Sequence, residues 1–160
     1  MRKKSDAQIY LEQVERLDTI IKNKLIEREQ WRDVALGITA CAESVMIEKN
    51  GRRELHKMEK VQSSARPSKM ADAIDKVVDM EAEINALIDR LIDTKREVVH
   101  IIERVDSPVE YDLLHRRYIQ YQSLQEIADH YHREYTWATT THGRALKSVE
   151  RILKGGGEDA

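Results

Sequence analysis

The chain has no phenylalanine, two prolines, six glycines and a single cysteine, Cys41, among its 160 residues. One cysteine cannot form an intramolecular disulfide, and no motif supplies the base that a catalytic thiol needs, so Cys41 is interpreted as a structural residue. No stretch approaches the roughly 20 apolar residues of a membrane span, and the polar N-terminus lacks the apolar segment of a signal peptide. These absences predict a cytoplasmic protein that does not bind membranes.

Charged residues make up 35% of the chain and apolar residues 41%, with a formal net charge of −2. Combined with so little proline and glycine, this composition favours long helices that expose much of their surface. No nucleophile elbow, phosphate loop or acid–base pair is recognisable, so we expect no enzymatic activity and no cofactor. Several histidines lie near the C-terminus, but none has the spacing of a metal-binding motif, and no metal site is predicted.

Apolar residues recur at steps of three and four along two long segments, which predicts two amphipathic helices at about residues 5–47 and 68–106. The second helix is expected to end before Pro108, because proline disfavours helix at the preceding residue. Residues 49–69 hold seven Lys or Arg and two Glu, and 49–67 is interpreted as a basic linker that contains the turn signal Asn50-Gly51. The apolar stripes are Tyr10, Val14, Leu17, Ile21, Leu25, Trp31, Ala35 and Ile38, then Met70, Ile74, Val77, Ile84, Ile88, Leu91, Val98, Ile102 and Val105.

Two such helices joined by a linker form a long antiparallel hairpin. A hairpin of two helices leaves much of each stripe in water, so we expect it to form a homo-oligomer or to pack against the C-terminal helices.

Residues 108–154 have shorter periods and predict three helices, at about 109–119, 123–131 and 134–154. The last two, with the tight turn between them, are typical of a helix-turn-helix. Ser123 is a candidate N-cap, and His132 occupies the turn position that needs a left-handed residue, where glycine is usual. Glu134 is expected to cap the final helix, and Ala138 is expected to point into the core.

The segments Glu126-Ile127-Ala128 and His142-Gly143-Arg144-Ala145-Leu146 resemble region four of bacterial sigma factors. Upstream, Val61–Ser64, Lys69–Ala73, Glu81–Asn85 and Asp89–Glu97 are similar to small phage and prophage proteins of the ArpU/RinA type. The resemblance implies a phage-encoded, sequence-specific transcriptional regulator that binds duplex DNA, with host RNA polymerase as a second candidate partner. The chain departs from the family pattern at four positions. His132 stands where glycine is usual, Glu134 stands where serine is usual, and Ala138 and Thr141 stand where larger apolar residues are expected.

The sequence thus predicts an all-α fold: a helical hairpin over 1–107, a sigma region-four-like helix-turn-helix domain over 108–154 and a disordered tail over 155–160. In a helix-turn-helix, the start of the second helix enters the major groove and reads base edges, and cations elsewhere contact phosphates. The predicted base-contacting residues are Tyr135, Thr136, Trp137, Thr139 and Thr140, and the predicted phosphate contacts are Arg144, Lys147, Arg116 and Arg117.

Two other functions fit the same pattern. Residues 109–154 hold seven Lys or Arg against six Asp or Glu, and this small excess also suits an adaptor or anti-sigma-like factor that acts on RNA polymerase without binding DNA. A phage packaging subunit that grips DNA without sequence preference is the other alternative.

Overall fold

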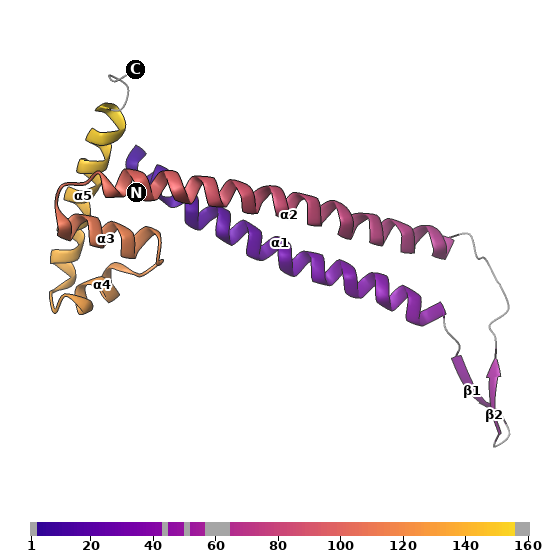
Figure 1. The fold of residues 1–160 in the computed structure, drawn as a ribbon. Coiled ribbons are helices and arrows are strands. Elements are labelled where there is room, and N and C mark those ends of the chain that lie inside the picture. Colours follow the sequence, from indigo (N-terminus) through magenta and orange to yellow (C-terminus); the bar gives the residue numbers. More distant parts are fainter. Residues whose placement is uncertain (1–2, 43–44, 50–51, 57–64, 156–160) are drawn as a thin grey trace. The chain divides into compact units, whose positions relative to one another are not determined.

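The computed structural model describes residues 3–42, 45–49, 52–56 and 65–155 (Figure 1). These residues form α1 (Asp6–Ala42), β1 (Val45–Lys49), β2 (Arg52–His56), α2 (Ala65–Glu103), α3 (Pro108–Tyr118), α4 (Leu124–His130) and α5 (Tyr135–Gly155). The chain is predominantly helical, which confirms the predicted all-α class. Across the described ranges, no helix combines the length and the apolar character that crossing a membrane requires.

The segment between the long helices differs from the prediction. The first helix ends at Ala42 rather than at residue 47, because Val45–Lys49 pairs with Arg52–His56 as a two-stranded antiparallel sheet. The prediction of a basic linker over 49–67 is therefore wrong at Lys49, which ends β1, at 52–56, which is β2, and at 65–67, which begins α2. Neither strand alternates apolar and polar residues, since their sequences are VMIEK and RRELH, so the strand pattern was not visible. Asn-Gly between two short runs is nevertheless a hairpin signal.

The ends of the other elements also differ in detail. α2 begins at Ala65 instead of residue 68 and stops at Glu103 instead of residue 106. Gly155, predicted to begin a disordered tail, is the last residue of α5, and the remainder of that tail, 156–160, lies outside the described residues.

The chain divides into two compact units. The large unit combines residues 1–20 with 87–160, and the small unit covers residues 21–86. Both long helices contribute to each unit, whereas the predicted division at residue 107 assigned both helices to the hairpin alone.

The core of the large unit joins the start of α1 to the end of α2 and to the C-terminal helices. Leu11 and Val14 of α1, with Val98 and Ile102 of α2, are fully buried in one apolar cluster with residues of α3 and α5. The first turns of α1 are therefore part of the core on which the C-terminal helices fold. The buried cluster comprises Ala7, Leu11, Val14, Val98, Ile102, Val105, Leu114, Tyr118, Ala145 and Val149.

The small unit pairs the second half of α1 with the first half of α2. Ile21 on α1 and Met80 and Ile84 on α2 are buried, and ion pairs flank them. The Nζ of Lys24 lies 2.6 Å from Oε2 of Glu83, and the carboxylate of Glu81 lies 3.9 and 3.7 Å from the guanidiniums of Arg28 and Arg32. These partly exposed pairs contribute little stability but favour the antiparallel register.

The buried stripe of α2 is shifted by one residue from part of the predicted one. Ile74 and Ile88 were predicted to face the core but are 44% and 37% exposed, whereas Ala73 and Met80 are buried. The predicted set mixed two neighbouring stripes, because an apolar residue precedes or follows several seam positions. In the buried seam, Ala73, Val77, Met80, Ile84, Leu87 and Leu91 follow one another at steps of four and three, the spacing of a coiled coil.

We expect Leu11→Ala to lower the free energy of unfolding by about 2–5 kcal/mol, because it removes a fully buried side chain from the core. Ile9 lies two residues earlier and is 52% exposed, so Ile9→Ala is the matched control and should change stability by no more than about 0.5 kcal/mol. Urea unfolding of the whole chain measures both. Equal effects of the two substitutions would contradict the assigned face of α1.

Candidate nucleic-acid interface

The three C-terminal helices have well-defined starts. Ser107 is the N-cap of α3, where its hydroxyl accepts a hydrogen bond from the amide of Glu110, and Pro108 occupies the first turn. Ser123 and Glu126 form a capping box at α4: the Ser123 amide donates to the Glu126 carboxylate at 2.6 Å and the Glu126 amide donates to the Ser123 hydroxyl at 3.2 Å. The predicted cap at Ser123 is thus present.

The turn between α4 and α5 closes with a pair of backbone hydrogen bonds. The amide of His132 donates to the carbonyl of Asp129 and the amide of Arg133 donates to the carbonyl of Ala128, which is the Schellman pattern of helix ends. That pattern requires a left-handed residue, and His132 has φ 52°. The predicted left-handed turn residue is therefore confirmed. Tyr121, after α3, has a second positive φ of 59° that the sequence did not indicate.

Asp112 ties α3 to the end of α4. Its carboxylate accepts hydrogen bonds from the Tyr131 hydroxyl and, at 2.7 Å, from Nε of Arg116. Partial burial raises the pKa of Asp112, but the hydrogen bonds from Tyr131 and Arg116 outweigh it and hold the pKa below its ordinary value. Tyr131 also packs against Trp137, with 5.1 Å between ring centroids, so this network positions the start of α5.

One face of α5 is buried and the other is open. Ala138, Thr141, Ala145 and Val149 are buried, at steps of three and four residues that place them on one side of the helix. The opposite side presents Thr136, Thr140, Gly143 and Lys147, all of them exposed. Below, this side is called the outer face of α5.

The predicted base-contacting residues occupy this face to different degrees. Thr136 and Thr140 are exposed, and Tyr135 is 51% exposed. Thr139 and Trp137 are half-buried, and Trp137 leans on the Tyr131 ring. The indole of Trp137 therefore supports the start of α5 and is only partly accessible.

The hydroxyl protons of the three threonines at the start of α5 are donated to other groups of that segment. Thr139 and Thr140 donate to the carbonyl of Thr136 at 2.9 and 2.8 Å, and Thr136 donates to the carboxylate of Glu134 at 3.4 Å. The carbonyl of Glu134 accepts from the amides of Trp137 and Ala138, which puts Glu134 at the predicted cap position. The hydroxyl oxygens keep free lone pairs, so they can accept hydrogen bonds. The threonine side chains also present their methyl groups.

The four predicted phosphate contacts fall into two classes. Arg144 and Lys147 are exposed, and neither has an ion-pair or hydrogen-bond partner for its side-chain cation among the described residues. Arg116 is paired with Asp112, while Arg117 donates to the carbonyl of Gln122 at 3.3 Å and lies 5.8 Å from the centre of the Tyr118 ring. Arg116 and Arg117 therefore have roles inside the unit.

A polar pair within the unit escaped the sequence analysis. The hydroxyl of Tyr118 lies 2.8 Å from Nε2 of His142, and the two rings stack. Burial, with a contribution from the nearby Arg117, lowers the pKa of His142, and burial raises the pKa of Tyr118. Their separation of 24 positions along the chain explains why no local pattern revealed the contact.

Gly143 lies on the outer face of α5, although the sequence did not predict it as a DNA contact. Apart from its two chain neighbours and the adjoining backbone of α5, a Cβ added at this position would meet no described atom within 4 Å. Glycine inside a helix costs about 1 kcal/mol relative to alanine, and packing in this chain does not require it. Gly143 leaves the α5 backbone open to close approach from outside.

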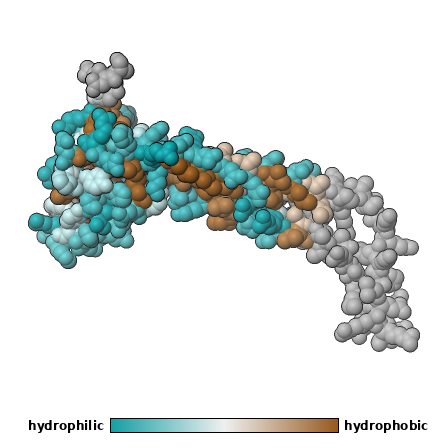
Figure 2. Space-filling model, viewed as in Figure 1, coloured by the Kyte–Doolittle hydropathy of each residue, from teal (hydrophilic) through white to brown (hydrophobic). Residues whose placement is uncertain are grey.

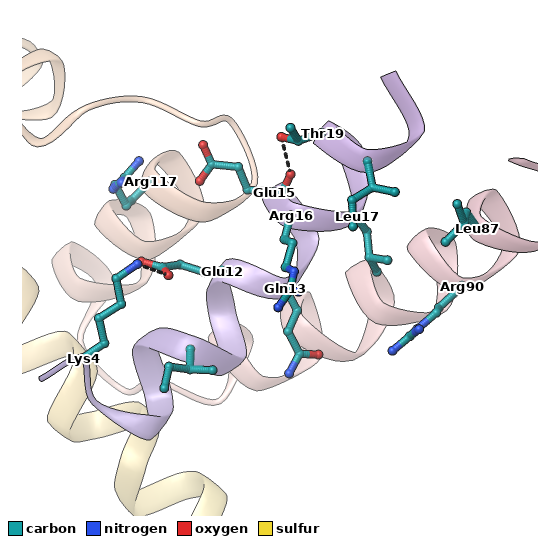
Figure 3. A pocket seen from close by; sticks show the side chains of 12 residues that line it. Lys4, Glu12, Gln13, Glu15, Arg16, Leu17, Thr19, Leu87, Arg90 and Arg117 are labelled. Carbon is teal, nitrogen blue, oxygen red and sulfur yellow. Dashed lines mark hydrogen bonds and ion pairs between the residues drawn. The ribbon is translucent and has the colours of Figure 1, made fainter. Parts of the chain in front are cut away.

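A surface cleft lies elsewhere in the large unit, beside the start of α1 (Figure 3). Lys4 and Glu12 point toward one another across it and form an ion pair of 2.6 Å. Partial burial raises the pKa of Glu12, but hydrogen bonds from Lys4 and Gln8 and the charge of Arg117 lower it more. Lys4 and Glu12, which line the cleft, therefore neutralise one another.

In the described ranges, no group of three or more His, Cys, Asp or Glu side chains is placed to hold a metal ion.

Comparisons of the chain with known protein families, with curated proteins and with solved structures found no match.

We expect His132→Gly to raise the free energy of unfolding by about 0.5–1 kcal/mol, because relief of the left-handed strain exceeds the extra chain entropy of glycine. His132→Ala keeps the strain and should give no such gain. Urea unfolding measures both variants. A destabilised glycine variant would show that the imidazole, rather than the turn geometry, is what position 132 needs.

His142 should make the unfolding free energy depend on pH. Its pKa lies below the ordinary 6.5 in the folded chain, so the unfolded chain binds the proton more readily and stability falls as the pH drops below that value. His142→Gln should reduce the loss of stability between about pH 7.5 and about pH 5.5, measured by urea unfolding. His130 is exposed, and His130→Gln, the control, should retain the dependence. Identical pH profiles for wild type and His142→Gln would contradict the assignment.

Proposed function

We propose that the chain is a DNA-binding transcriptional regulator whose α5 inserts its outer face into the major groove of duplex DNA. The observation that carries the proposal is the exposed side of α5, presented next to the left-handed turn at His132 while the other side is fixed in the core. A helix held in this way, at the end of a helix–turn–helix segment, has the geometry with which such proteins read base edges.

The chemistry of the outer face suits base recognition. Because the hydroxyl protons of Thr136, Thr139 and Thr140 are engaged internally, their lone pairs can accept hydrogen bonds from the amino groups of adenine or cytosine. The exposed threonine methyls can contact the thymine methyl group. Gly143, with open space about its missing side chain, allows the backbone of α5 to approach the groove closely.

The cations supply the sequence-independent part of binding. Arg144 and Lys147 are exposed on α5 and free for phosphates, which are the usual partners of Arg and Lys beside a recognition helix. With Arg116 and Arg117 engaged inside the unit, the positive charge available is modest. Binding is therefore expected to be strengthened by a protein partner, and the likeness to sigma region four and to ArpU/RinA-type phage regulators makes host RNA polymerase the first partner to test.

We expect Arg144→Gln/Lys147→Gln to weaken binding to every duplex and to reduce the slope of log affinity against log salt concentration by about 2, because two phosphate contacts are lost. Fluorescence anisotropy with labelled duplexes from the chain's own genomic neighbourhood, at several salt concentrations, measures both quantities. The matched control is Arg90→Gln/Arg96→Gln, which removes two exposed cations of α2 and should leave the slope nearly unchanged.

The pattern of binding distinguishes the candidate functions. Tight binding to one duplex supports the regulator, whereas equal and strongly salt-dependent binding to all duplexes would favour a packaging role. Absence of binding by the folded wild-type chain at low salt would contradict the proposal and favour an adaptor that acts on RNA polymerase.

A further inference from the structure

Several large apolar side chains on α2 are exposed, in addition to those of its buried seam. Ile74, Val78, Ile88 and Ile92 are 44%, 58%, 37% and 50% exposed. Figure 2 shows apolar surface along the long helices. A helix in a two-helix pair needs one apolar stripe, so a second one is left without a partner in the single chain.

These four apolar residues, together with the polar Glu81 and Asn85 between them, have the spacing of a coiled-coil seam. Starting at Ile74, steps of four and three residues lead through Val78, Glu81, Asn85 and Ile88 to Ile92. Each position follows a position of the buried seam by one residue. Because all of them lie on one continuous helix, the helix geometry alone places them on a common face, about 27 Å long at 1.5 Å per residue. This set is called the exposed seam.

Exposed apolar residues of α1 do not form such a seam. Within the part of α1 whose side chains are described, Ile9, Ile26, Val34 and Leu36 are exposed, but their separations of 17, 8 and 2 residues do not follow a heptad. Single exposed apolar residues are ordinary on a protein surface, whereas a heptad of them on one helix indicates a helical partner.

The order of residues in the exposed seam is self-complementary. Read from either end, it is two apolar residues, two polar residues and two apolar residues, with the same spacing. In an antiparallel pair of α2 helices, Ile74 faces Ile92 of the second copy and Val78 faces Ile88 of the second copy. Such an arrangement is an isologous two-fold interface, in which the same patch serves both chains.

The two central positions determine the direction. In the antiparallel pair, Glu81 meets Asn85 of the second copy, and the carboxylate can accept a hydrogen bond from the amide. A parallel pair would instead place Glu81 against Glu81, with like charges at the interface. Arg28 and Arg32 of the same chain already lie 3.9 and 3.7 Å from the Glu81 carboxylate, so this charge enters the interface with partners.

The residues beside the exposed seam, on the side away from the buried seam, also fit the antiparallel register. Asp75, Ala82 and Asp89 follow one another there at steps of seven. Ala82 lies next to the two-fold axis, where its small side chain lets the helices approach. Asp75 faces Asp89 of the second copy at the solvent edge, where salt screens their repulsion.

We propose that a second copy of this chain covers the exposed seam, with the two α2 helices antiparallel and the two-fold axis near residue 83. This assembly does not depend on DNA binding. Because dimer formation is measured on the protein without DNA, its absence would be distinguishable from a failure of the proposed function.

Sedimentation equilibrium of the full chain at tens of micromolar tests the assembly. We expect a dimer for the wild type and a monomer for Val78→Glu/Ile88→Glu, with the association constant reduced at least tenfold. Because both side chains are exposed in the single chain, this variant should keep its helical circular dichroism. The matched control is Ile26→Glu/Val34→Glu on α1, which should remain dimeric. A monomeric wild type, or a dimer unaffected by the α2 substitutions, would overturn the proposal.

Cysteine cross-linking tests the direction, in a Cys41→Ser background that removes the only natural thiol. In the antiparallel register, Val78→Cys alone and Ile88→Cys alone should form no disulfide between copies, whereas a mixture of the two variants should. Disulfide formation by each variant on its own would overturn the antiparallel register and indicate a parallel pair.

Discussion

Everything that α5 presents to solvent depends on the burial of its other face. Ala145 and Val149 lie in one cluster with Leu114 and Tyr118 of α3 and with residues from the start of α1 and the end of α2. Because the cluster combines residues from the start of the chain, from its middle and from its end, the outer face of α5 is set by the whole large unit. The start of α1 is as much a part of that support as α3.

A second constraint is the length of the hairpin helices. Two long helices that each contribute one apolar stripe bury little apolar surface against one another. The large unit and the small unit add different interactions to this narrow core. In the large unit, α3 and α5 complete the core over α1 and α2. In the small unit, ion pairs of Lys24, Arg28 and Arg32 with Glu81 and Glu83 flank the core. Along α2, the exposed seam remains available for a further helix.

The sequence predicted those features that follow from local rules. The cap at Ser123, the left-handed residue at His132 and the inward side chain of Ala138 each depend on neighbours within a few residues, and each is present. The exposed position of Thr136 and Thr140 follows from the period of the helix once Ala138 is placed.

The features that sequence did not predict depend on contacts between distant residues or on competition between similar patterns. The stack of His142 on Tyr118 joins α5 to α3, and no local signal marks it. Ile74 and Ile88 were assigned to the core because two adjacent stripes on α2 are both apolar, and only packing against α1 decides between them. The engagement of Arg116 could have been found, since Asp112 lies four residues earlier on the same helix, at the spacing of an ion pair.

Chemical-shift mapping of backbone amides tests directly whether the outer face of α5 binds duplex DNA. On titration with duplex DNA, we expect the largest shifts at Thr136, Thr140, Gly143 and Lys147, and small shifts at Ala138, Ala145 and Val149 on the buried side. Shifts confined to α2, or the absence of shifts in a folded chain at low salt, would contradict this expectation.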